Sequence, residues 1–127
     1  MDCIFCKILK KEIPAGFIYR GEKVSVFKDI HPKAPVHVLI VPERHIESID
    51  QLTEEDREVI AEMLMVAKKT AQDLGVAGGY KLLINVGKKG GQLVDHLHMH
   101  LMGGWPEKEI DIEVAERFKD DLTSLLK

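Results

Sequence analysis

Histidine alternates with leucine and methionine in residues 95–102, which read Asp-His-Leu-His-Met-His-Leu-Met, and this alternation constrains the fold more than any other stretch. A period of two predicts a β-strand with two different faces. At about 3.3 Å per residue, His96, His98 and His100 would project from one face about 6.6 Å apart, with the apolar side chains toward a core. A helix would scatter the three rings around its axis, so only an extended backbone gathers them.

Three histidines in register favour chemistry over a structural role. Titratable side chains collect at functional sites, and imidazole is both a nucleophile near neutral pH and the commonest metal ligand. A histidine that attacks phosphorus would form a covalent nucleotidyl-histidine, while its neighbours hold the phosphoryl oxygens and protonate the leaving group. A merely structural cluster and a histidine metal site are the alternatives.

The composition suits one soluble domain spanning residues 1–127. The chain is 45% apolar and 31% charged, as is usual for a globular protein. Its net charge of −3 argues against a nucleic-acid polymer as partner, which needs a basic surface, but not against a small nucleotide. No apolar run approaches the roughly 20 residues of a membrane span and no signal peptide is recognised, so we expect a cytoplasmic protein.

The hydrophobic pattern elsewhere predicts an α+β domain built around an antiparallel sheet. Apolar and β-branched runs between turn residues predict four further strands, at residues 17–20, 23–28, 36–41 and 80–86. Gly21 and Glu22 are expected to form the tight turn between the first two. With the histidine strand, the sheet would have five strands.

Three helices are expected from apolar residues at helical spacing. A short one lies within residues 1–12. The long helix would begin at Thr53, an N-cap residue with Asp56 three positions later, and end at Gly75. An acidic amphipathic helix is expected in a C-terminal extension, residues 104–127.

A glycine-rich loop, residues 87–92, directly precedes the histidine strand. Glycines let backbone N–H groups approach an anion, and Lys88 and Lys89 add positive potential. We interpret the loop as a phosphate seat that delivers an anion to His98 and His100. The alternative is an ordinary connection between strands.

Cys3 and Cys6 form a Cys-x-x-Cys pair with two interpretations. A redox pair of the thioredoxin type normally sits in a βαβ context that this segment lacks. Structural zinc, which takes thiolates and imidazoles in a tetrahedron, is the stronger interpretation. The pair needs two more ligands, for which His45 and His96 are candidates.

The alternating segment resembles the motif of the histidine-triad (HIT) family, His-φ-His-φ-His-φ-φ with φ apolar, and residues 96–102 match every position. The supporting segments that match are Asn85 and residues 27–30, 35–37, 41–45 and 90–92. The resemblance covers roughly residues 3–104 without a gap and is strongest to the Hint branch. It implies a HIT-like α+β fold that pairs into a homodimer, and hydrolysis or transfer at the α-phosphorus of a nucleotide, typically of purine nucleoside phosphoramidates.

The resemblance also implies roles for individual residues. His98 corresponds to the nucleophile, and His100 to the residue that contacts the α-phosphate and the leaving group. His37 and His96 correspond to supporting catalytic histidines. Asp29 would hold the ribose hydroxyls, while Asn85 and Gln92 would contact phosphate. The residues expected around the nucleotide, of which the apolar ones also suit plain core, are Ile4, Phe5, Ile8, Phe27, Asp29, Ile30, Asn85, Gly91, Gln92, Leu93, His98 and His100.

Zinc also gains support from the resemblance. Some bacterial members, and the related galactose-1-phosphate uridylyltransferases, join a Cys-x-x-Cys to a histidine after the third strand and to the first histidine of the motif. The resemblance therefore implies that Cys3, Cys6, His45 and His96 would together hold a structural zinc ion in this chain. As a ligand, His96 would keep only a part in orienting the strand.

Two side chains depart from the family pattern. Leu93 stands where Hint proteins usually carry a serine near the phosphate, and Asp95 where an aromatic residue is common. The leading hypothesis is a zinc-containing homodimeric nucleotide hydrolase that acts through a nucleotidyl-His98. The alternatives are a dinucleoside polyphosphate hydrolase and a nucleotide-binding adaptor without activity.

Overall fold

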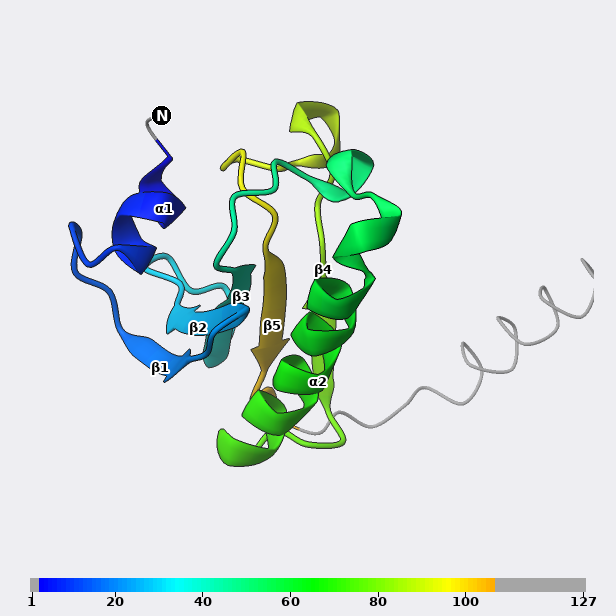
Figure 1. The fold of residues 1–127 in the computed structure, drawn as a ribbon. Coiled ribbons are helices and arrows are strands. Elements are labelled where there is room, and N and C mark those ends of the chain that lie inside the picture. The colour runs from blue at the N-terminus through cyan, green and yellow to red at the C-terminus, as the bar shows by residue number, and fades with distance from the viewer. Residues whose placement is uncertain (1–2, 107–127) are drawn as a thin grey trace, which may run out of the picture.

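The computed structural model describes residues 3–106 as one sheet with a helix on either side (Figure 1). The strands are β1 (Phe17–Arg20), β2 (Val24–Lys28), β3 (Val36–Pro42), β4 (Tyr80–Leu83) and β5 (Met99–Gly103). The helices are α1 (Ile4–Leu9) and α2 (Arg57–Asp73), with the short 3-10 helices η1 (Ile49–Gln51), η2 (Glu54–Asp56) and η3 (Lys88–Gly90). The predicted C-terminal helix lies outside the described residues.

The five strands form one antiparallel sheet in the order β1-β2-β3-β5-β4. This confirms the α+β class and the five-stranded sheet. β3 lies at the centre and pairs with β5 from Val36 opposite Gly103 to Ile40 opposite Met99. The histidine-bearing strand is therefore held between two neighbours, which fixes the direction in which its side chains point.

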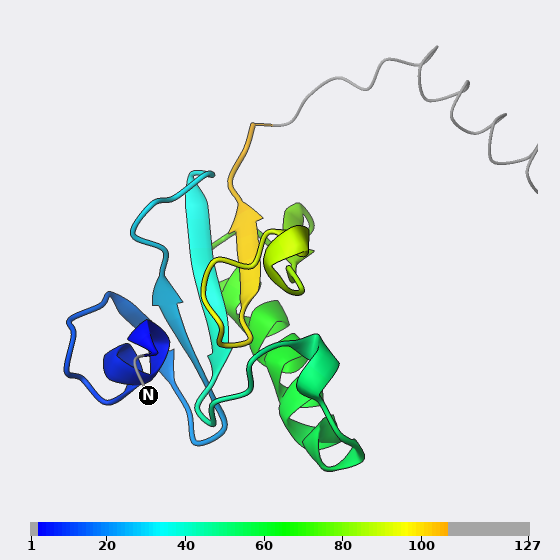
Figure 2. The same cartoon turned by 90° about the horizontal axis from the view of Figure 1, so that it is seen from above.

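Each face of the sheet carries its own apolar core, because the strands alternate. Figure 2 shows α1 and α2 on opposite sides of the sheet. On the α2 side, Met63 and Ala67 pack against strand residues that include Ile40 and Leu101. On the α1 side, Phe5 of the helix packs with strand residues, in a cluster formed by Cys3, Phe5, Ile8, Leu9, Phe27, Leu39 and Val41. Full burial of one such large apolar side chain stabilises the fold by roughly 2 kcal/mol.

The long helix begins slightly later than predicted. Thr53 and Asp56 do form a reciprocal cap, in which the Thr53 backbone N–H donates to Asp56 Oδ2 at 2.8 Å. The cap holds one 3-10 turn, η2, so that the α-helical hydrogen bonds start only at Arg57.

No helix within residues 3–106 is long and apolar enough to cross a membrane.

The histidine strand also begins later than predicted. β5 starts at Met99, so His96 and His98 lie in the irregular segment that leads into it, with His96 in a bend. The backbone there follows other partners: the Leu97 N–H donates to Ile46 O at 2.6 Å instead of joining the sheet ladder. β4 likewise ends at Leu83, three residues before the predicted end at Val86.

Candidate active site

Three histidines meet on the α1 side of the sheet. His100 projects from β5, His37 from the neighbouring strand β3, and His98 from the segment just before β5. The ring centroids of His98 and His100 are 5.0 Å apart, and those of His37 and His100 are 5.1 Å apart. The intervening residues Leu97, Met99 and Leu101 pack in the core on the α2 side. The alternation therefore places its imidazoles and its apolar side chains on opposite faces, as expected.

A backbone carbonyl determines which ring nitrogen of His98 carries the proton. His98 Nδ1 lies 2.7 Å from the carbonyl oxygen of His96, which only accepts, so Nδ1 carries the proton. The other nitrogen, Nε2, then holds the free lone pair. Burial lowers the pKa of His98 below its ordinary value, which keeps the ring neutral at pH 7. The Phe5 ring packs edge-on against the His98 ring, with the two ring centroids 5.0 Å apart, and restricts its rotation. His98 is thus prepared as a nitrogen nucleophile.

The protonation of His100 is set through His37. The backbone N–H of Lys33 donates to His37 Nδ1 at 3.0 Å, so the His37 proton resides on Nε2. That Nε2–H donates to His100 Nδ1 at 2.9 Å, and the Oδ2 atom of Asp29 lies 3.4 Å from the same Nε2. His100 must therefore carry its own proton on Nε2, as a donor for a neighbouring group.

His100 stays neutral over a wide range of pH. Burial is the largest cause, and the nearby His98 and His37 add to it, so that the pKa of His100 falls to about 4. At pH 7 the ring is a hydrogen-bond donor through Nε2–H rather than an acid. His98 and His100 thus present a lone pair and an N–H side by side. The lone pair of His98 suits attack on a phosphorus atom, and the N–H of His100 suits donation to a phosphoryl oxygen.

A second cluster, of four residues, joins α1 to the histidine segment. The Sγ–Nδ1 distances are 3.3 Å from Cys3 to His96 and 3.4 Å from Cys6 to His45, and the two Nδ1 atoms are 3.2 Å apart. One ligand atom from each residue lies within 4.8 Å of all the others. The arrangement has the ligand types of a tetrahedral metal site with two sulfurs and two nitrogens.

The orientation of His96 fits a metal ligand. Its Nε2 lies 2.9 Å from the carbonyl oxygen of Pro42, which accepts, so Nε2 carries the proton and Nδ1 presents its lone pair to the sulfurs. Both ring nitrogens are thereby used. The carbonyl oxygen of His96, and not its ring, contacts His98, and the supporting catalytic role expected of the His96 ring stays a prediction.

Asp29, His37 and His100 also lie close enough to hold a metal ion. The Lys33 N–H that donates to His37 Nδ1 argues against it. A metal on His37 Nε2 would require the proton on Nδ1, where it would face another donor. We therefore assign this group to a hydrogen-bond relay.

The glycine-rich loop is braced by Gln92 from within. The Gln92 side chain is buried: its Oε1 accepts from the Gly87 N–H at 2.9 Å, and its Nε2 donates to the carbonyl oxygens of Glu47 and Val94 at 2.7 and 2.9 Å. Both side-chain amide hydrogens are committed to these carbonyl oxygens, and the phosphate contact expected of Gln92 stays a prediction. Asn85 keeps its place beside the loop, where a Cβ on Gly91 would lie 3.7 Å from Asn85 Cγ.

The apolar residues expected around the nucleotide divide into two groups. Phe5, Ile8 and Phe27 are buried in the α1-side core, in agreement with the alternative that some of them are plain core. Three others are exposed, namely Ile4 at 44%, Ile30 at 78% and Leu93 at 92%. Asp29 is half-buried, and its Oδ1 accepts from the His31 N–H at 2.8 Å.

Sequence reasoning missed the backbone groups that fix the rings. The carbonyl oxygens of Pro42 and His96 and the N–H of Lys33 each set the proton position of one histidine. Side-chain patterns carry no signal for such contacts, because every residue except proline has the same backbone donor and acceptor.

Comparison with known proteins finds the same architecture. Residues 2–110 match a family model described as scavenger mRNA decapping enzyme C-term binding. A HIT-like protein from Synechocystis is 43% identical over 105 residues, which cover 83% of this chain and 92% of that protein. The crystal structure of a HIT family hydrolase from Legionella pneumophila is 44% identical, has a TM-score of 0.81 and is matched over 84% of this chain and 96% of that one. A histidine triad nucleotide-binding protein from Candida albicans is 32% identical with a TM-score of 0.71, over 98% of this chain and 97% of that one.

Proposed function

Because this chain belongs to the histidine-triad (HIT) family of hydrolases, we propose that it cleaves purine nucleoside phosphoramidates at the α-phosphorus through a covalent nucleotidyl-His98. The observation that carries the proposal is the pairing of a His98 lone pair on Nε2 with a His100 proton on Nε2. The first supplies a nucleophile and the second a donor for the phosphoryl oxygen. The nucleotide is suggested by the family and by the described nucleotide binding of the Candida protein.

The proposed reaction has two steps. In the first, His98 Nε2 forms a bond to phosphorus, the phosphorus–nitrogen bond of the substrate breaks, and the leaving amine takes a proton from solvent. The His98 ring becomes cationic, and its Nδ1–H bond to the His96 carbonyl stabilises that charge. In the second step water attacks phosphorus, the bond to Nε2 breaks, and a proton passes to solvent. The products are the nucleoside monophosphate and an amine.

The other residues position these groups. His37 keeps the His100 proton on Nε2 throughout, so the donor always faces the developing negative charge. Asp29 would bind the ribose hydroxyls with the lone pairs that the His31 N–H leaves free. Asn85 and the backbone at Gly91 would contact phosphate. Ile4, Ile30 and Leu93 are exposed and would cover the nucleotide.

We further propose that Cys3, Cys6, His45 and His96 hold a structural zinc ion. The fit rests on the four converging ligand atoms and on the Pro42 carbonyl that directs His96 Nδ1 toward them. The ion would tie α1 to the segment whose carbonyl oxygen orients His98. Its part is to stabilise the site and not to take part in the chemistry.

A homodimer is the proposed assembly. Within the described residues β4 pairs only with β5, so its other edge is open. Large apolar side chains are exposed on β4, on α2 and after β5, at Leu64, Met65, Leu82, Leu83 and Trp105. An open strand edge beside exposed apolar residues favours pairing with a second copy.

A substrate panel tests the proposed function. Adenosine 5'-phosphoramidate and a dinucleoside polyphosphate are offered to one preparation, and release of nucleoside monophosphate is followed. We expect turnover of the phosphoramidate, which His98→Ala abolishes and His31→Ala leaves intact, since His31 is exposed. Preference for the dinucleoside polyphosphate would favour the alternative hydrolase, and binding without turnover would favour the adaptor.

A further inference from the structure

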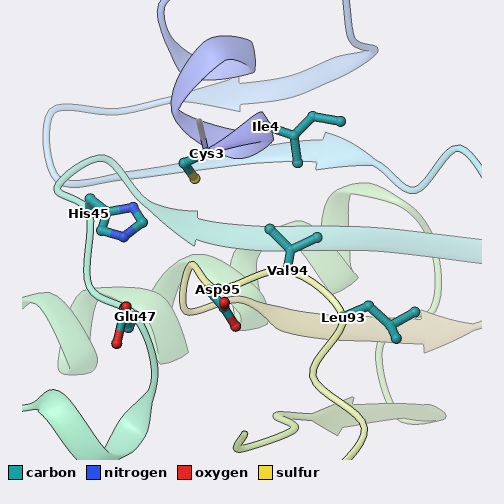
Figure 3. Close-up of a pocket in the computed structure, with 7 residues that line it drawn as sticks. All are labelled: Cys3, Ile4, His45, Glu47, Leu93, Val94 and Asp95. Carbon is teal, nitrogen blue, oxygen red and sulfur yellow. The ribbon is translucent and has the colours of Figure 1, made fainter. Parts of the chain in front are cut away.

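A pocket of about 380 Å³ opens beside the cluster of Cys3, Cys6, His45 and His96, which is called the metal cluster below. It does not lie over His98 and His100. Two of the four ligands in the cluster, Cys3 and His45, line it. Figure 3 shows Cys3 and Ile4 on one side of the hollow, Glu47 and Asp95 on the opposite side, and His45 near one end. The lining residues are Cys3, Ile4, His45, Glu47, Leu93, Val94 and Asp95.

The charged side chains that line this pocket are both acidic. Glu47 and Asp95 are exposed, and within residues 3–106 neither takes part in a salt bridge. Among the described residues, no ion pair therefore compensates their two negative charges at the mouth of a partly enclosed space. Walls of low dielectric concentrate the field of these charges, and this field attracts cations.

We propose that this pocket is the loading route for the metal cluster, in which Glu47 and Asp95 capture a hydrated divalent cation and pass it to Cys3 and His45. The inference rests on the metal centre proposed above. Carboxylate oxygens are suitable transient partners for a hydrated cation because they bind it through its water shell. As each sulfur–metal bond forms, the thiol loses its proton to solvent, and the ion loses water.

The pocket reaches only two of the four ligands, which supports this route. His96 is completely buried, Cys3 is 8% exposed, and Cys6 is half-buried but does not line the pocket. His45 is half-buried and lines the pocket together with Cys3. An ion that enters here meets one sulfur and one nitrogen first, and then Cys6 and His96. The pocket thus supplies both the attraction and the first two ligands.

Rapid mixing with Co²⁺ tests the inference, because cobalt–thiolate bonds absorb light and report each loaded site. The full chain is stripped of metal, kept reduced with a phosphine, and compared with Glu47→Gln/Asp95→Asn. The control is Glu55→Gln/Asp73→Asn, which removes two charges from residues that do not line the pocket. At low salt we expect association about three- to tenfold slower in the pocket variant alone. At about 0.5 M salt the difference should shrink below about twofold, because screening removes steering.

The outcomes separate this inference from the metal centre itself. A normal cobalt–thiolate band with equal association rates in all three proteins would overturn the loading route and leave the centre intact. A slower rate that persists at high salt would also overturn it, since that indicates local damage to the ligands. If the wild-type chain gives no band, the metal centre fails and the loading route fails with it. A second variant, Glu47→Lys/Asp95→Asn, leaves one positive charge at the pocket and should load more slowly than the neutral pair at low salt.

Discussion

At the scale of single residues, backbone groups decide which nitrogen of each histidine is free. The His96 carbonyl leaves a free lone pair on Nε2 of His98, and the Pro42 carbonyl leaves one on Nδ1 of His96. The Lys33 N–H acts indirectly: it fixes the proton of His37 on Nε2, and this N–H in turn donates to His100 Nδ1. The side chains supply the chemistry, and the backbone determines which chemistry each ring performs.

Replacement of His37 tests this relay. His37→Leu removes the donor to His100 Nδ1, so His100 is free to place its proton there and turn a lone pair toward the phosphoryl oxygen. We expect kcat to fall by about 10²-fold with a smaller change in KM. His37→Gln, which retains an N–H, should recover part of the loss. Steady-state kinetics on the phosphoramidate provide the measurement, and a His37→Leu enzyme within about twofold of wild type would refute the relay.

The low pKa of His100 predicts a loss of stability in mild acid. Burial first, and then His98 and His37, lower the pKa to about 4, whereas the unfolded chain has a value near 6.5. Between these values the unfolded state binds a proton that the folded state does not, so the free energy of unfolding falls as the pH drops from about 6.5 to about 4. Above this window His100 contributes no pH dependence.

Urea titrations at about pH 7.5 and about pH 5 measure that loss. His98 and His96 also have lowered pKa values and share in it, so the informative quantity is the difference made by His100. His100→Gln should lose less stability between the two pH values than wild type does. Equal losses in the two proteins would show that His100 titrates normally in the folded state.

At the scale of elements, the sequence predicted faces better than boundaries. The alternation of residues 96–102 placed imidazoles and apolar side chains on opposite faces, because the period of a strand fixes that choice. It did not show that β5 begins only at Met99. The Leu97 N–H pairs with Ile46 and the His96 ring with Pro42, residues about fifty positions away. A local sequence pattern does not predict contacts with residues so far away in the chain.

The glycine-rich loop depends on one buried amide. Gln92→Ala would leave the Gly87 N–H and the carbonyl oxygens of Glu47 and Val94 without their present partner. We expect a loss of about 2–3 kcal/mol in the free energy of unfolding, measured by urea denaturation. Leu93→Ala is the control and should change little, because Leu93 is 92% exposed. Equal effects of the two substitutions would refute the bracing role.

At the scale of the whole molecule, the cluster of Cys3, Cys6, His45 and His96 connects helix α1 to the segment before β5. The spacing of Cys3 and Cys6 predicted a metal site with His45 and His96 as candidates for the remaining ligands, and the resemblance to the HIT family supported the same set. The structure brings all four together. The roles of the nucleotide contacts stay predictions, as does the cytoplasmic location, because they depend on molecules and surroundings outside the chain.

The proposed association of two chains gives a second prediction at the scale of the whole molecule. Leu82→Lys places a charge on the edge strand β4, where Leu82 is 40% exposed. If the homodimer forms through this edge, the variant should sediment as a monomer at concentrations where wild type is a dimer. Leu93→Lys adds the same charge on a different exposed surface and should leave the dimer unchanged. A Leu82→Lys protein that remains dimeric would place the interface elsewhere.

The covalent intermediate on His98 is the point on which the whole account depends. Adenosine 5'-phosphoramidate is mixed with enzyme, the reaction is stopped by base within the first turnover, and the peptides are analysed by mass spectrometry. We predict a nucleotidyl group on the peptide that contains His98, bonded through Nε2 and absent after His98→Ala. Turnover at the normal rate with no adduct, or with the adduct on His100, would contradict the account.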